Sequence, residues 1–331
     1  MGVERSKLLV VDAEAGPRRD LGVALAQLGY AVDQADEGWP ALELVASSVS
    51  AGQPYRAVIA AVDLPDIHGL KLLELIKSSY PTLPVIVVSA TGNETTPDAV
   101  TRRHGDAYLP KPFTVDQLTA AVERIPKSEI KAAELPATDA QPTPASAYAM
   151  VRLRDGADRM ALFGRLHALE QATCCDAVHG DYDVALLLNA SDQAALGRLV
   201  DSEISSCPEV ASVTLLPIVK PDLDPGLQGF FDHLRQPRCA GQTAGQGDRA
   251  DALATYLLVS IEPGRFAEAF PRLSFMRGVV ACDATSGEHD AVALIRTHSF
   301  EENKRILRDD IKRIDGIARA RSMKVITILD I

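Results

Sequence analysis

The sequence predicts a mixed α/β protein in which an α/β domain is followed by a repeated α+β unit. Residues 7–125 alternate short apolar runs with amphipathic stretches, a pattern typical of a parallel sheet covered by helices. After a Pro- and Ala-rich segment, the chain contains the same order of segments twice. Ala147–Gly156 (AYAMVRLRDG) matches Thr255–Gly264 (TYLLVSIEPG), which marks an internal repeat.

The composition fits a folded protein with ample core material. The chain has 331 residues, of which 47% are hydrophobic and 24% are charged. Its 34 Lys and Arg against 45 Asp and Glu give a net charge of −11, which disfavours a protein that coats nucleic acid or anionic lipid. No apolar run approaches the ~20 residues of a membrane span, and the first residues run directly into a strand-like segment. We therefore expect a cytoplasmic protein with no membrane partner.

The five cysteines show no metal-binding pattern. Cys174 and Cys175 are adjacent, whereas Cys207, Cys239 and Cys282 stand alone. There is no CxxC, and no His lies at zinc-site spacing from a Cys. We expect reduced, mostly buried thiols, no metal and no cofactor.

The α/β domain is expected at residues 1–125. Its apolar runs are the predicted strands, and a helical pattern follows each of them. The predicted strands are 8–11, 31–34, 57–62, 84–89 and 107–109, and the predicted helices are 15–28, 37–50, 68–79, 95–104 and 114–125.

Two segments carry too few large apolar residues to bury a core. Residues 126–146 are rich in Pro, Ala, Ser and Thr, which indicates a linker. Residues 221–254 form a second linker or loop, with a short helix expected around Phe230–Leu234. The two copies of the repeat therefore occupy 147–220 and 255–331.

Each copy of the repeat predicts the order β-α-β-β-α-β. Cys175–Asp183 (CDAVHGDYD) matches Cys282–Asp290 (CDATSGEHD), and an apolar strand follows each. This order predicts a ferredoxin-like arrangement, a four-stranded antiparallel sheet with two helices on one face. Because Val184–Leu188 is apolar on both faces, the open face of the sheet needs a cover, most simply the other copy. We therefore expect an intrachain pseudo-dimer.

The first domain resembles the receiver domain of two-component response regulators. The resemblance rests on KLLVVDAE (7–14), ADEG (35–38), AVDLPDIHGLKLLELIK (61–77), VIVVSAT (85–91) and DAYLPKPF (106–113). It implies a flavodoxin-like (βα)5 fold with a phosphorelay pocket at the carboxyl ends of the strands.

The chemistry that the resemblance implies needs residues that this chain replaces. The family's phosphoacceptor Asp stands four residues before the Pro of the loop after the third strand, and that position is Ala61. The family holds Mg²⁺ with two adjacent acids after the first strand, and those positions are Asp12 and Ala13. A methyl group cannot form an acyl phosphate, and few carboxylates hold a divalent metal weakly. We expect a degenerate pseudo-receiver.

Other receiver positions are kept. Ser89, Tyr108 and Lys111 match the hydroxyl, the aromatic switch residue and the Lys of the family. With no phosphoryl group to bind, Lys111 is expected to pair with Asp12, and a cis Lys–Pro peptide is one way to fix its loop. Glu14 is one position late for the metal site, and in an extended segment it would point away from its neighbour.

The role expected for this domain is docking or dimerisation with a protein partner. The candidate surface comprises Thr91–Arg103 and Tyr108. Phosphorylation stays open in one form, with Asp63 as a substitute phosphoacceptor. Asp63 lies two residues further into the loop, however, and positioning contributes much of phosphoryl-transfer catalysis.

The repeated unit resembles the Lrp/AsnC-type effector domain, also called the RAM domain. The resemblance rests on AYAMVRL (147–153), HGDYDVALLL (179–188) and CPEVASVTLLPIV (207–219). It implies oligomerisation through the sheets and binding of a small molecule, commonly an amino acid, near the Gly-Asp-Tyr-Asp turn. The implied ligand-binding residues are Gly180, Asp181, Tyr182 and Asp183 in the first copy, and Gly287, Glu288, His289 and Asp290 in the second.

A plain turn is the alternative interpretation of these residues. Gly-Asp is an ordinary hairpin sequence in which Asp bonds its own backbone. Backbone N–H groups and carboxylates at such a turn can also hold both ends of a zwitterion. Because His289 replaces Tyr182, the two copies need not be equivalent.

No DNA-binding motif is recognisable. The receiver-like domain occupies the place of the family's helix-turn-helix, and no zinc finger or basic region occurs. The most basic stretch is Lys304–Lys324, in which Asp309, Asp310 and Asp315 offset many of the charges. We expect no direct binding of nucleic acid.

The sequence favours a non-enzymatic signalling regulator that forms homo-oligomers and senses a small molecule. Two alternatives remain open. One is a scaffold without a ligand. The other is an enzyme with a cavity between the sheets, for which His179, Tyr182, His289 and Asp290 are the candidate polar groups.

Overall fold

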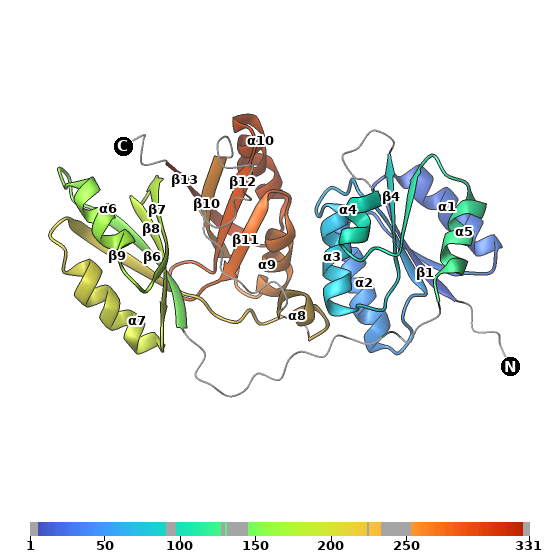
Figure 1. The fold of residues 1–331 in the computed structure, drawn as a ribbon, viewed down its shortest axis with the longest axis horizontal. Coiled ribbons are helices and arrows are strands. Elements are labelled where there is room, and N and C mark those ends of the chain that lie inside the picture. Colours follow the sequence, from blue (N-terminus) through green and yellow to red (C-terminus); the bar gives the residue numbers. More distant parts are fainter. Residues whose placement is uncertain are drawn as a thin grey trace. The chain divides into compact units, whose positions relative to one another are not determined.

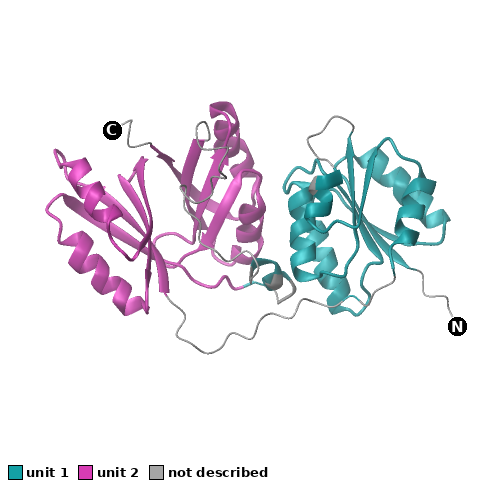
Figure 2. Cartoon of the chain, viewed as in Figure 1, with its two compact units in different colours: residues 1–136, 223–235 teal, residues 137–222, 236–331 magenta. Residues whose placement is uncertain are grey.

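The structure, a computed structural model, describes residues 6–90, 97–126, 130, 145–223, 225–232 and 253–326. The chain divides into two compact units, 1–136 with 223–235 and 137–222 with 236–331 (Figure 2). Most of the predicted linkers, part of the predicted docking segment 91–103 and the last predicted strand residues lie outside the described ranges. Within those ranges, no helix combines the length and the apolar character needed to cross a bilayer.

The first unit contains a five-stranded parallel sheet with helices on both faces (Figure 1). Its strand order, β2-β1-β3-β4-β5, confirms the predicted flavodoxin-like fold. The strands are β1 (Lys7–Val11), β2 (Ala31–Ala35), β3 (Ala57–Ala61), β4 (Val85–Ala90) and β5 (Ala107–Lys111). The helices are α1 (Ala15–Gln27), α2 (Gly38–Ser50), α3 (Gly69–Ser79), α4 (Pro97–Arg102) and α5 (Val115–Arg124).

The loop after β3 holds the start of α2. The Asp66 carboxylate accepts from the backbone N–H groups of Gly38 at 2.7 Å and Trp39 at 2.6 Å. These are amide groups that a helix leaves without partners in its own first turn. The carboxyl-end loops of β2 and β3 are thereby fixed to each other.

The second unit contains two βαββαβ copies, as predicted, whose strands join in one sheet of order β11-β12-β10-β13-β7-β8-β6-β9. The first copy comprises β6 (Ala145–Leu153), α6 (Arg159–His167), β7 (Ala172–His179), β8 (Val184–Ala190), α7 (Gln193–Leu199), the π-helical turn η1 (Val200–Ser205) and β9 (Val210–Pro217). The second comprises β10 (Leu253–Ile261), α9 (Phe266–Phe275), β11 (Val279–Ala284), β12 (Ala291–Thr297), α10 (Phe300–Arg305), the turns η2 (Ile306–Asp310) and η3 (Ile311–Arg313), and β13 (Ile317–Val325).

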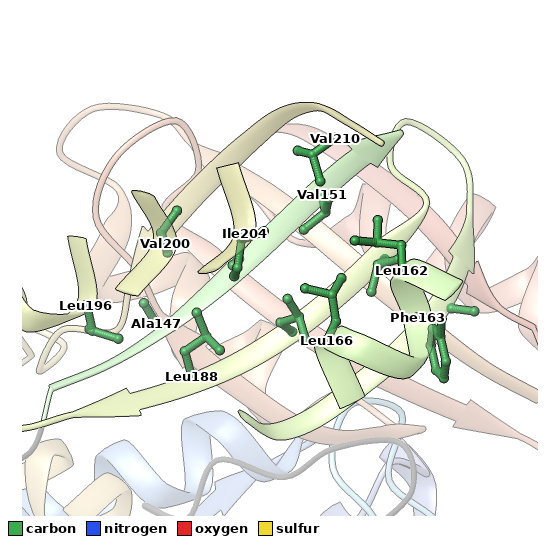
Figure 3. Packing of buried hydrophobic residues seen from close by; sticks show 14 residues of the cluster. Ala147, Val151, Leu162, Phe163, Leu166, Leu188, Leu196, Val200, Ile204 and Val210 are labelled. Carbon is green, nitrogen blue, oxygen red and sulfur yellow. The ribbon is translucent and has the colours of Figure 1, made fainter. Parts of the chain in front are cut away.

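The helices of each copy cover one face of its sheet. In the first copy, Leu162 and Leu166 of α6 and Leu196 of α7 pack with Val151 and Leu188 of the strands (Figure 3). Leu162, Leu188 and Leu196 are fully buried. This core matches the helix-covered face that the repeat predicts.

The two copies join at both ends of a pseudo-twofold arrangement. Lys324 and Val325 of β13 pair with His179 and Val178 of β7. At the equivalent edge, Ile218 forms a bridge with Thr285, and the Val219 N–H donates to the Ala284 carbonyl oxygen at 2.9 Å. Each copy therefore lends the end of its last strand to the other copy.

The open sheet faces pack on each other, which confirms the predicted intrachain pseudo-dimer. Side chains from both copies form one buried cluster. Its members include Tyr148, Met150, Leu187 and Leu216 of the first copy and Tyr256, Leu258, Leu294 and Met323 of the second. The apolar character of both strand faces is explained by this second core.

One further helix, α8 (Pro225–Asp232), belongs to the first unit although its residues follow the first copy in the chain. The sequence predicted a helix around Phe230–Leu234, and the observed helix begins earlier. Residues 233 and 234 lie outside the described part of the chain.

Candidate functional sites

The first candidate site lies at the carboxyl ends of β1 and β5, where Asp12 meets Lys111. The Lys111 Nζ donates to Asp12 Oδ2 at 2.6 Å, which confirms the predicted pair. Asp12 Oδ1 accepts from the Glu14 backbone N–H at 3.0 Å, and Arg18 donates to the Asp12 carbonyl oxygen. The Lys111–Pro112 peptide is cis. Both carboxylate oxygens of Asp12 are therefore engaged within the chain.

Alanine stands at two positions of this site. Ala61 ends β3 and is 4% exposed, and Ala13 lies in a bend directly after Asp12. Glu14 itself has an extended backbone, as assumed. Glu14 Oε1 lies 3.8 Å from Lys111 Nζ.

These residues do not fit a magnesium ion. Magnesium prefers octahedral oxygen ligands and is usually held through carboxylates. Here Asp12 carries the carboxylate, and the ammonium group of Lys111 already lies on it. Across the ranges that the structure describes, no group of three or more His, Cys, Asp or Glu is arranged to hold a metal.

The other predicted receiver residues lie on separate elements. Ser89 lies on β4, is 2% exposed, and its Oγ is 3.4 Å from the Ala90 carbonyl oxygen. Asp63 is an exposed residue in the loop after β3. Tyr108 lies on β5 and lines a cavity of about 480 Å³ together with Gln117 and other residues of α5.

A second cavity, of about 520 Å³, opens beside the Asp12–Lys111 pair. Its lining includes Val10, Ile59 and Val88 of the strands, Leu21 of α1 and Phe113 of the loop before α5. Sequence patterns did not indicate this cavity, because its walls come from elements that are far apart in the sequence.

The second candidate site comprises the turns between the middle strands of each copy. Gly180 and Gly287 adopt φ values of 155° and 114°, which favour glycine. A side chain at Gly180 would also meet Met323 Cγ at 3.2 Å. Asp183 and Asp290 use their carboxylates on the backbone, since Oδ2 accepts from Leu153 N–H at 2.8 Å and from Ile261 N–H at 2.7 Å, respectively.

The first-copy turn is completed by side chains from both copies. The Tyr182 hydroxyl donates to Thr214 Oγ1 at 3.0 Å. Arg152 lies over the Tyr182 ring and donates to the Asp181 carbonyl oxygen. Arg321 of the second copy pairs with the Asp181 carboxylate at 2.9 Å. The carboxylate of Asp181 therefore serves the contact between the copies.

The second-copy turn differs, because the smaller His289 stands where Tyr182 stands in the first copy. His289 is 3% exposed, and its Nδ1 lies 3.3 Å from Ser260 Oγ. Its Nε2 is buried and has no hydrogen-bond partner among the described residues. Glu288, the equivalent of Asp181, is exposed. The two turns are thus chemically distinct.

Two hydrogen bonds, the Tyr–Asp cross-bonds, link the copies inside the shared core. Tyr148 donates to Asp283 Oδ2 at 2.7 Å, and Tyr256 donates to Asp176 Oδ2 at 2.6 Å. The two rings meet edge-on with centroids 6.4 Å apart. Burial, together with the Asp176 carboxyl, raises the pKa of Tyr256 well above its usual value, which keeps its hydroxyl protonated as a donor. Sequence reasoning missed these bonds, although Tyr148 and Tyr256 align in the repeat.

The described cysteines are free thiols, but they are not mostly buried as expected, since Cys174 is buried and the other three are half-buried. The four thiols are Cys174, Cys175, Cys207 and Cys282. Burial raises the pKa of Cys175 and of Cys282 to about 12, so both stay protonated at neutral pH. Cys239 lies outside the described residues.

Comparison with known families identifies both kinds of domain. The model of the response regulator receiver domain matches residues 8–123. The model of the Lrp/AsnC ligand binding domain matches residues 146–221 and again 255–329. The chain therefore contains a receiver domain followed by two tandem Lrp/AsnC ligand binding domains. Both kinds of domain are regulatory, so the chain has the domains of a regulator.

Similar proteins include response regulators of mycobacteria. Response regulator MprA of Mycolicibacterium vanbaalenii is 33% identical over 119 residues, which are 36% of this chain and 49% of that relative. MprA of Mycobacterium avium is 31% identical over 119 residues, 36% of this chain and 50% of the relative. The chain spans about half the length of the curated relatives that it matches.

Similar solved structures include a response regulator receiver domain protein from Clostridium thermocellum. It is 24% identical, with coverage of 36% of this chain and 91% of that chain and a TM-score of 0.33. NtrX from Brucella abortus, solved with ADP, is 31% identical, with coverage of 37% of this chain and 27% of that chain and a TM-score of 0.33.

The Tyr256→Phe variant should lower the free energy of unfolding of the second unit by about 1.5–3 kcal/mol, because it removes a donor from the Asp176 carboxyl. Tyr182→Phe is the matched control. It breaks a bond between two hydroxyls and should cost about 0.5–1.5 kcal/mol. Urea unfolding of both variants measures the difference. Equal losses would contradict a special role for the cross-bonds.

His289 should make stability depend on pH. Burial lowers the pKa of His289 below its ordinary value of 6.5; Glu288 and Asp290 oppose this shift, whereas Arg321 and Arg319 reinforce it. The contribution of neutral His289 is therefore complete above about pH 6.5 and is lost as the pH falls through the folded-state pKa.

Replacing His289 by Tyr, the residue of the first copy, should flatten the decline of the melting temperature between about pH 7.5 and 5.5. His298→Tyr, at an exposed position, is the control and should leave the decline unchanged. An unchanged slope in the His289→Tyr variant would show that another group titrates.

Proposed function

We propose that this chain is a non-enzymatic regulator whose receiver domain docks on a protein partner without being phosphorylated. The observation that carries the proposal is the Asp12–Lys111 pair next to Ala61. Asp12 Oδ2 and Lys111 Nζ are 2.6 Å apart, and the position of the phosphoacceptor carries a methyl group. A nucleophilic oxygen is needed for an acyl phosphate. In this pocket the Lys111 ammonium group is therefore paired with the Asp12 carboxylate in place of a phosphoryl group.

We further propose that the paired ligand binding domains sense a small molecule such as an amino acid at the turns, and that they mediate homo-oligomerisation. Support comes from the unequal turns, since His289 Nε2 is buried without a hydrogen-bond partner among the described residues. A scaffold without a ligand is the second candidate. It is favoured by Asp183 and Asp290, whose carboxylates already accept backbone N–H groups.

We also propose that the chain does not contact nucleic acid directly. The basic stretch 304–324 is laced with acids: Arg308 lies 3.5 Å from Asp309, and Arg313 lies 3.7 Å from Asp310. Arg265 pairs with Asp315 at 2.6 Å. Such pairing offsets the positive charge that phosphate binding would use.

Acetyl phosphate with Mg²⁺ should leave the intact mass of the chain unchanged, because the phosphoacceptor position carries no oxygen. The double variant Ala13→Asp/Ala61→Asp is the positive control, since it restores the carboxylates of the pocket. Gain of one phosphoryl group by the double variant alone supports the proposal. A phosphoryl group on the unmodified chain that Asp63→Asn abolishes would overturn it.

A thermal-shift panel of the twenty amino acids separates sensing from scaffolding. Because a ligand that binds only the folded state raises its stability, a sensed amino acid should raise the melting temperature progressively as its concentration increases. Gly287→Ala, which strains the second-copy turn, should reduce this rise, whereas Gly52→Ala, at another positive-φ glycine in the receiver domain, should keep it. No shift with any member would favour the scaffold.

A further inference from the structure

The helix α8 has an unusual place in the chain. It follows β9 of the first ligand binding domain and precedes β10 of the second, yet its residues belong to the compact unit of the receiver domain. The receiver match ends at residue 123, so α8 is an addition to a receiver that already has its five strands and five helices. Part of the linker between the two ligand binding domains therefore belongs to the receiver unit.

The packing of α8 on the receiver is apolar and aromatic. Within the first unit, α8 contacts α2 and α3. Leu223, Leu227, Phe230 and Phe231 are 8%, 9%, 0% and 6% exposed. Leu227, Phe230 and Phe231 stand three and four residues apart within α8, which places them on one face of the helix, and Leu223 precedes the helix. The Phe230 ring meets the Tyr80 ring edge-on, with centroids 5.7 Å apart.

This packing accounts for the helix itself. α8 has eight residues, and isolated helices shorter than about 12–15 residues are marginal in water. Its conformation therefore depends on the surface formed by α2 and α3. Tyr80, at the end of α3, is 4% exposed, and loss of α8 would uncover it.

The residues before α8 are tied to the pairing of the two ligand binding domains. Ile218 bridges to Thr285, and Val219 N–H donates to the Ala284 carbonyl oxygen. Only Lys220, Pro221 and Asp222 separate Val219 from Leu223. A short segment that contains a proline has little freedom to absorb a displacement. A three-residue segment therefore joins the strand end that pairs the two copies to the start of the α8 region.

We propose that the α2–α3 surface of the receiver is a binding surface for an amphipathic, phenylalanine-bearing helix, and that α8 occupies it within the same chain. Loosening of the paired ligand binding domains at the Ile218–Thr285 bridge releases α8 and uncovers this surface. The inference rests on and deepens the proposed function, because it names α8 as the segment through which the ligand binding domains would act on the receiver. By reciprocity, occupation of the surface by α8 stabilises the pairing.

Hydrogen exchange of the full chain, read by mass spectrometry, tests the docking of α8. Phe230→Ala should raise the exchange rate of the α8 amides by at least about a hundredfold and should also raise exchange in α2 and α3. Phe300→Ala, the same truncation at a residue that is 66% exposed, is the matched control and should leave these amides unchanged. Leu227→Ala replaces Phe230→Ala if that variant fails to fold.

Unprotected α8 amides in the unmodified chain, or equal exchange in Phe230→Ala and Phe300→Ala, would overturn the docking.

The coupling has its own test. Tyr256→Phe, which breaks one cross-bond between the copies, should raise exchange in α8, and an unchanged α8 would overturn the coupling. None of these measurements uses a phosphoryl donor or an effector, so their failure is distinguishable from failure of the proposed function.

Discussion

Covering the open sheet faces is the constraint on which the second unit depends. Strands such as β8 are buried along most of their length, since one face packs on the helices and the other on the second copy. The polar groups in this shared core are arranged reciprocally. Tyr148 of the first copy donates to Asp283 of the second. Tyr256 of the second copy donates to Asp176 of the first. Because even a half-buried carboxyl is costly without a donor, each sheet needs the other for polar as well as apolar reasons.

In the pocket of the receiver, too, a carboxylate finds its hydrogen-bond donors within the chain. The carboxylate of Asp12, directly after β1, lies beside the ammonium group of Lys111. Here the two groups form a direct pair, and backbone N–H of Glu14 takes the second oxygen of Asp12. The fold of a receiver is preserved around this pair, because the buried strands and the cap that Asp66 supplies to α2 do not depend on the side chains at positions 13 and 61.

Most of the fold could be predicted because it rests on local patterns. Apolar runs predicted the strands. The internal repeat predicted two copies of one fold whose open sheet faces cover each other. The Asp12–Lys111 pair was also predictable from the resemblance. Partners across the copies, such as Arg321 for Asp181, were not, since they depend on the register between two sheets. The place of α8 was likewise hidden, because an amphipathic face shows that a helix packs but not on what.

Because the two copies belong to one chain, their pairing does not depend on protein concentration. Two separate protomers pair according to how many molecules are present, whereas here the second copy is always supplied by the same polypeptide. A symmetric dimer of identical chains must also change both of its turns with every substitution. In this chain Tyr182 and His289 occupy equivalent places in two different environments. Covalent duplication thus permits one half to specialise while the other continues to hold the sheets together.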